Sequence, residues 1–91
     1  MAHLHTENTK ILARVRRLKG QLNGVERMLV EGEECYPILQ SAAACRGAFN
    51  SLMRELILDH IDHHLAEREE ASDEIRETAR EIQDIVKSFL K

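Results

Sequence analysis

Apolar residues recur along the first third of the chain at alternating spacings of four and three positions. The members of this series are Ile11, Val15, Leu18, Leu22, Val25 and Leu29. Residues at these spacings share one face of an α-helix, and a heptad repeat of this kind is typical of a helix that packs along a partner. The pattern therefore predicts an amphipathic helix over residues 7–30, ended by the acidic, glycine-containing segment 31–34.

A second series with the same spacing begins after this break. It consists of Ile38, Ala42, Cys45, Phe49, Leu52 and Leu56, and it leads on to His60, His64 and Leu65. Pro37 stands just before the series, and proline is tolerated in the first turn of a helix because the amide hydrogen that it lacks has no partner there. We expect a second helix over residues 37–68.

A shorter series near the C-terminus predicts a third helix. Its apolar members are Ile75, Ala79, Ile82, Val86 and Phe89. Ser72 is a favourable N-cap, and Asp73 and Glu74 place acidic charge in the first turn, where the helix dipole stabilises it. No stretch alternates with the period of a β-strand. The expected fold is all-α, with two long helices in an antiparallel hairpin and a short C-terminal helix, in one domain over residues 1–91.

Helices of this length cannot bury their apolar faces within one short chain. Two long helices and one short one leave much of each seam without a partner. Dimerisation into an antiparallel four-helix bundle would cover these seams, so we expect a homodimer.

The composition agrees with such a protein and narrows its class. Of the 91 residues, 43% are hydrophobic but only 3% are aromatic, which indicates an aliphatic core. The chain contains neither an apolar run that could span a bilayer nor a signal-peptide pattern, so we expect a cytoplasmic protein that does not enter the membrane. Its two cysteines do not form the framework of a secreted disulfide scaffold and are expected to be reduced. Of the two, Cys45 lies on the apolar seam and is expected in the core.

The charge is distributed unevenly along the chain. The net charge is −3, yet residues 1–30 carry a net +4. Four polar residues recur there at helical spacing, flanked by two further cations: Lys10, Arg14, Arg17 and Gln21, with Arg16 and Lys19 beside them. A local basic surface attracts a phosphate backbone whatever the overall charge, so this stripe is a candidate DNA-binding surface. An ordinary solvated helix face remains the alternative.

Three side chains that can bind metal lie along the second helix. His60 and His64 are one turn apart, a spacing that lets two imidazoles converge on one ion. Cys35 precedes His60 by 25 positions, roughly 37 Å along a helix, so the three groups cannot meet within one chain. In an antiparallel pair of second helices, Cys35 of one protomer would face His60 and His64 of its partner, giving two symmetric sites. The alternative to a metal site is that the two histidines are ordinary surface residues and the cysteine is a small buried residue.

The chain resembles the CsoR/RcnR-type repressors, a family of small helical bacterial regulators. The resemblance covers nearly the whole chain and rests on residues 14–22 (RVRRLKGQL), Cys35, 46–48 (RGA), 50–53 (NSLM) and His60. It implies a homotetramer of antiparallel dimers that binds double-stranded operator DNA without a helix-turn-helix and releases it when an effector binds. It also implies a cross-protomer site containing Cys35 and His60, in a regulator that is not an enzyme.

Comparison within this family suggests the effector. The copper(I) sensors have a second cysteine where this chain has His64, and imidazole in place of thiolate favours nickel, cobalt or zinc. The nickel/cobalt branch is similar in having a histidine third from its start, here His3. Ala2 is small, so Met1 is expected to be removed. The α-amine exposed in this way would be a further ligand in the coordination shell of the metal. The resemblance implies a nickel or cobalt site of His3, Cys35, His60 and His64, whose occupancy derepresses a metal exporter.

Five other interpretations remain open. The formaldehyde-sensing branch is also similar, and it would join the amine of Ala2 to the thiolate of Cys35 through one methylene. That branch carries proline at position two and lacks the histidine at position 64, which counts against it here. His63 could replace His64 as a ligand, and His5 could extend a terminal metal clamp. A metal-dependent enzyme could be built on the histidines at 60, 63 and 64, but the sequence contains no substrate-binding loop to support it. A purely structural helical adaptor is the last alternative.

Overall fold

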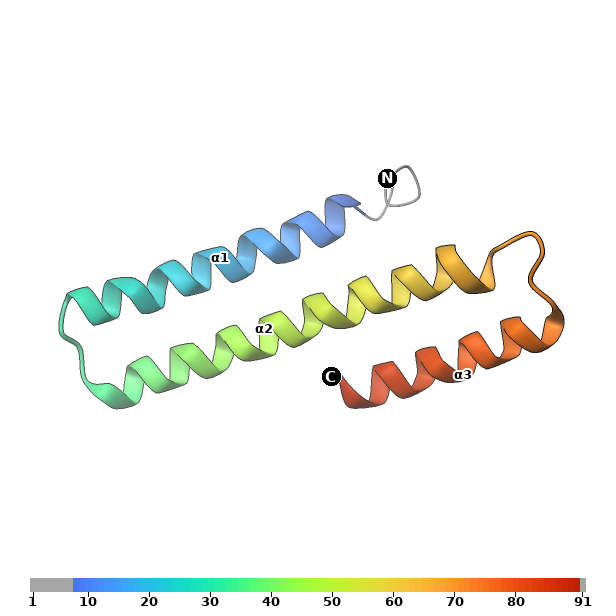
Figure 1. The fold of residues 1–91 in the computed structure, drawn as a ribbon. Coiled ribbons are helices and arrows are strands. Elements are labelled where there is room, and N and C mark those ends of the chain that lie inside the picture. Colours follow the sequence, from blue (N-terminus) through green and yellow to red (C-terminus); the bar gives the residue numbers. More distant parts are fainter. Residues whose placement is uncertain (1–7, 91) are drawn as a thin grey trace.

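The structure is a computed structural model that describes residues 8–90 (Figure 1). Its helical elements are α1 (Asn8–Val30), α2 (Cys35–Ile61), η2 (Asp62–Ala66) and α3 (Asp73–Phe89). No strand occurs within this part of the chain, so the all-α, three-helix protomer predicted from the sequence is confirmed. The predictions made for Ala2, His3 and His5 fall outside the described residues.

The three helices lie side by side in a single layer. α1 and α2 run antiparallel, and α3 folds back along the C-terminal half of α2 (Figure 1). The molecule measures 57 × 26 × 11 Å, so its thinnest dimension is about one helix diameter. The turn between α1 and α2 passes through Gly32, whose φ of +70° is accessible to glycine without steric cost.

The helix boundaries follow the sequence pattern except near residue 62. α2 begins at Cys35, so Pro37 does lie in its first turn, and Ser72 caps α3 by accepting a hydrogen bond of 3.1 Å from the amide of Ile75. The expected continuous second helix over residues 37–68 is wrong at its end. The α-helix stops at Ile61 and is followed by a π-helical turn, in which the amide of residue 67 donates to the carbonyl of Asp62 at 2.8 Å. Hydrophobic spacing cannot reveal one widened turn.

The protomer has only a thin core. Among the described residues, the buried apolar side chains are Cys45, Leu52, Ile61, Ala66 and Ala79. The expectation that Cys45 is a core residue is thereby confirmed. Large apolar side chains of the predicted seams remain open to solvent: Leu22 is 52% exposed, and Phe49 is 49% exposed. None of the helices described in the structure combines the length and apolar character needed to cross a membrane.

Each helix carries large apolar side chains that are open to solvent, and their positions are here together called the apolar face. Successive residues of a helix are rotated by about 100°, so within each helix these side chains fall on one side. They are Leu22, Leu29, Leu39, Phe49, Leu56, Ile82, Ile85 and Phe89. Charged residues from each helix line two hollows, and this surface is here called the polar face: Lys10, Arg14, Arg17, Glu55, Arg80 and Lys87. One thin layer therefore carries both an apolar and a charged surface.

Candidate effector site and DNA-binding surface

α2 presents Cys35 and His60 on one side, near its two ends. The 25 positions between them amount to about seven helical turns, so the two side chains lie on nearly the same side of the helix. Both residues are exposed. Between them on that side lie Leu39, Phe49 and Leu56, which are 60%, 49% and 36% exposed. The candidate ligands therefore lie at the two ends of the apolar face of α2.

His64 lies in the π-helical turn and stacks on His60, which lies in the last turn of α2. Their ring centroids are 4.5 Å apart and their planes differ by 27°, so the two imidazoles are stacked. Residues four apart are already neighbours on a regular α-helix. The wider turn sets where the second ring lies relative to the first, because His60 precedes this turn and His64 lies within it. The structure thus brings together two of the three predicted ligands at the end of α2.

Cys35 remains far from this pair within the protomer, at the other end of α2. No group of three or more histidine, cysteine or carboxylate side chains in the described residues could hold a metal ion. Two imidazoles and one thiolate are a donor set that suits borderline divalent ions. Such a set can form only if a second chain supplies Cys35.

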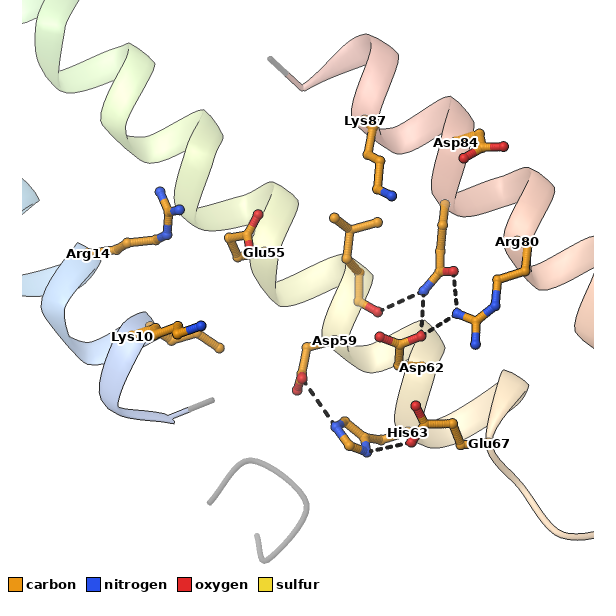
Figure 2. Close-up of a pocket in the computed structure, with 13 residues that line it drawn as sticks. Lys10, Arg14, Glu55, Asp59, Asp62, His63, Glu67, Arg80, Asp84 and Lys87 are labelled. Atoms are coloured by element: carbon orange, nitrogen blue, oxygen red, sulfur yellow. Dashed lines mark hydrogen bonds and ion pairs between the residues drawn. The ribbon is translucent and has the colours of Figure 1, made fainter. Parts of the chain in front are cut away.

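His63 lines the hollow on the polar face and contacts two carboxylates. Its Nε2 lies 3.3 Å from Oδ1 of Asp59, and its Nδ1 lies 3.4 Å from Oε1 of Glu67 (Figure 2). Asp59 is itself buried, and its Oδ2 has no hydrogen-bond partner among the described residues. The structure therefore places His64, rather than His63, beside His60.

Asp62 joins the π-helical turn to α3. It accepts hydrogen bonds from Arg80 and from the amide of Gln83, the latter at 2.9 Å (Figure 2). Burial acts to raise the pKa of the Asp62 carboxyl, but the hydrogen bonds from Gln83 and Arg80 and the positive charge of Arg80 outweigh this effect. The pKa of Asp62 is consequently lower than usual, and the carboxylate is ionised at neutral pH. Sequence reasoning missed this contact because Asp62 and Gln83 are 21 positions apart.

The polar face contains an open hollow of about 530 Å³ where the three helices meet. Lys10 and Arg14 of α1 line one side of it, opposite Arg80 and Lys87 of α3, with Glu55 on α2 (Figure 2). Acidic and basic groups thus alternate around its wall, and nothing in it resembles the apolar pocket of an enzyme.

Part of the basic stripe predicted from the sequence is found on this face. Arg14 and Arg17 line a second, small hollow together with Ala48 and Ser51 of α2. Gln21 is half-buried on α1. Arg16 and Lys19 are exposed and line neither hollow, so they lie beside the stripe rather than in it. Lys10, Arg14 and Arg17 therefore form a row of cations along the two hollows of the polar face.

Comparison with known proteins identifies the family. The model of the metal-sensitive transcriptional repressors matches residues 7–88. The chain is 38% identical, over the full length of both proteins, to an uncharacterised protein of the bioA 5′ region of Serratia marcescens. It is 40% identical to the transcriptional repressor RcnR of Citrobacter koseri, over 84% of this chain and 81% of that protein.

A solved structure shares both the fold and the sequence. It is a glutamate-to-histidine variant of the formaldehyde-responsive regulator FrmR from Salmonella enterica serovar Typhimurium. The TM-score is 0.66 and the identity 38%, covering 92% of this chain and 94% of the other. These matches confirm the expectation of a regulator that is not an enzyme. The chain belongs to the metal-sensitive transcriptional repressors of the CsoR/RcnR type, whose members bind operator DNA and act as oligomers.

Proposed function

We propose that this chain is a repressor that binds operator DNA in its effector-free form and releases it on binding nickel or cobalt, so that a metal exporter is expressed. The observation that carries this proposal is that Cys35 and His60 lie on one side of α2 and that His64 stacks on His60. The stacked imidazoles lie at one end of the apolar face and the exposed thiol at the other.

The apolar face supports a shared site. Covering Leu39, Phe49 and Leu56 with the same face of a second chain removes apolar surface from water, which is favourable. If the two α2 helices run antiparallel, the start of one lies beside the end of the other. Cys35 of one protomer then meets His60 and His64 of its partner, and the dimer contains two sites. Two such dimers form the homotetramer proposed for the working repressor.

The donor set favours nickel or cobalt. A bound ion would act as the effector, and two imidazoles with one thiolate suit nickel, cobalt or zinc better than copper(I), which prefers sulfur. His3 would extend the coordination shell toward the higher number that nickel and cobalt accept. Zinc is the expected competitor, because it accepts the same three ligands in a four-coordinate site.

The position of the cations supports operator binding by the polar face. Lys10, Arg14 and Arg17, continued by Gln21 and flanked by Arg16 and Lys19, would neutralise DNA phosphates. Ligation across the apolar face would fix two protomers relative to each other. Release of DNA requires that this fixed arrangement differ from the one that binds the operator, because an effector acts only through a difference between states.

A cobalt titration tests the metal site. The wild-type protein should develop a thiolate-to-metal charge-transfer band, and Cys35→Ala should lack it, with Cys45→Ala as the matched control that keeps the band. A wild-type protein without the band would refute the metal site.

An operator-binding assay tests the polar face. Arg14→Ala and Arg17→Ala should each weaken operator binding and lower the salt slope by about one unit per lost phosphate contact. Arg68→Ala is the matched control, since that cation lies between η2 and α3 and pairs with Glu70. Equal affinity of all three variants for the operator would refute the proposed surface.

Formaldehyde sensing is the second candidate function. It is supported by the exposed thiol of Cys35 and by the 38% identity to the formaldehyde-responsive FrmR. In that case the amine of Ala2 and the Cys35 thiolate would react with formaldehyde, and neither His60 nor His64 would be required. Release of the operator from a His64→Ala variant by formaldehyde, together with no release of the wild type by nickel or cobalt, would favour it.

A further inference from the structure

Gln83 is a buried polar residue at the junction of α2, η2 and α3. The residue is only 6% exposed. Among the described residues, Asp59 is the only other polar residue that is buried. Its amide nitrogen donates to the carbonyl of Leu58 at 3.2 Å and to Oδ1 of Asp62 at 2.9 Å. Its amide oxygen accepts a hydrogen bond of 2.6 Å from Arg80. One side chain of α3 thus makes three hydrogen bonds at this junction.

Two of these hydrogen bonds flank the point where the α-helix becomes a π-helix. The amide of Asp62 is shared between the carbonyls of Leu58 and Asp59, which weakens each of the two bonds. The carbonyl of Asp62 already belongs to the wider turn, because it accepts from the amide of residue 67, five positions ahead. Gln83 supplies an additional donor to the Leu58 carbonyl at this weakened position. Its amide therefore stabilises the transition to the wider turn.

The wider turn carries His64, while His60 lies just before it in α2. The mutual position of the two rings therefore depends on how the transition from α-helix to π-helix is held. The observed rings lie 4.5 Å apart, with 27° between their planes. Because Gln83 reaches the turn from the side opposite the two imidazoles, it affects their arrangement without contacting either.

We propose that Gln83 is a positioning residue for the effector site: its hydrogen bonds to Leu58 and Asp62 hold the π-helical turn and thereby pair His64 with His60. The proposal rests on the proposed function in one respect, namely that these two histidines bind the effector. The same amide accepts from Arg80, which borders the hollow on the polar face. Gln83 therefore links the turn that carries the histidines to the face that carries the cations.

The test compares two variants of the full chain. Gln83→Met keeps the length and volume of the side chain but removes both amide donors. Arg80→Met removes the ion pair to Asp62 and leaves the Gln83 donors in place. We expect Gln83→Met to lower cobalt affinity by about 10-fold or more, as do other losses of groups that orient metal ligands. Arg80→Met should leave the cobalt affinity nearly unchanged, because both Gln83 donors remain in place.

A second measurement separates positioning from the metal site itself. In the metal-free protein, the NMR shifts of the His60 and His64 ring protons report their stacking directly. These shifts should change in Gln83→Met and not in Arg80→Met, even if the wild type binds no cobalt. If Gln83→Met does not fold, the shorter Gln83→Asn replaces it, with the same direction of change expected. Ring shifts and cobalt affinity equal to those of the wild type would overturn the proposal.

Discussion

At the residue scale, the effector site depends on which histidine accompanies His60. The sequence left His63 and His64 open as alternatives, because residues three and four apart both face a neighbour on an α-helix. The structure separates them through a feature that spacing cannot show. His64 stacks on His60, while His63 lies between the carboxylates of Asp59 and Glu67. Asp59 and Glu67 lie four positions before and after His63, which is visible in the sequence. This spacing alone did not show whether His63 would face these acids or His60.

The identity of residue 64 should set the choice of metal. In His64→Cys, a thiolate replaces one imidazole, and soft copper(I) should release the operator while the response to nickel and cobalt falls. The measurement is operator release in a series of nickel, cobalt, zinc and copper(I). His63→Cys is the matched control, since that side chain pairs with Asp59 and Glu67 rather than with His60. Equal copper(I) responses of the two variants would contradict the assignment of His64.

At the scale of the elements, periodicity predicted where the helices begin, whereas many residues of the predicted seams are exposed in the protomer. The start of α3 at its Ser72 cap and the burial of Cys45 followed from local chemistry. What could not be predicted is set by contacts between distant positions. The end of the α-helical part of α2 depends on Gln83, 25 positions from the Leu58 carbonyl that it contacts. A one-dimensional pattern contains no such information.

The packing of α3 on α2 should be sensitive to volume at Ala79. This residue is fully buried against Ile61 and Ala66. Ala79→Leu would force these elements apart and should lower the free energy of unfolding by about 1–3 kcal/mol. Ala13→Leu, at an exposed position of α1, should change it by less than about 0.5 kcal/mol. Chemical denaturation of both variants measures the difference, and equal stabilities would show that α3 does not pack closely here.

At the scale of the whole molecule, the protomer is a layer one helix thick with chemically different faces. The sequence predicted the basic stripe and the apolar seams separately. It did not show that cations of α1 and α3 line one hollow, because that depends on how three helices are arranged side by side. The arrangement suggests a division of labour in which copies of the chain meet through the apolar face and DNA binds the polar face.

The apolar face should control self-association. Phe49 lies near the middle of α2 and is 49% exposed, so in an antiparallel pair it would lie close to its counterpart. Phe49→Glu would bring two carboxylates together in an apolar contact and should yield monomers, whereas Phe49→Leu should not. Sedimentation equilibrium distinguishes these outcomes. A Phe49→Glu protein that associates as strongly as the wild type would place the interface elsewhere.

The central claim is that each effector site is shared between two chains, and a mixed dimer tests it most directly. Cys35→Ala and the double variant His60→Ala/His64→Ala should each lack the cobalt–thiolate band. A heterodimer of the two, isolated with different affinity tags, would combine Cys35 of one chain with both histidines of the other at one of its two sites. We predict that this heterodimer regains the band at half the wild-type intensity. A heterodimer without the band, beside a wild type that shows it, would contradict the shared site.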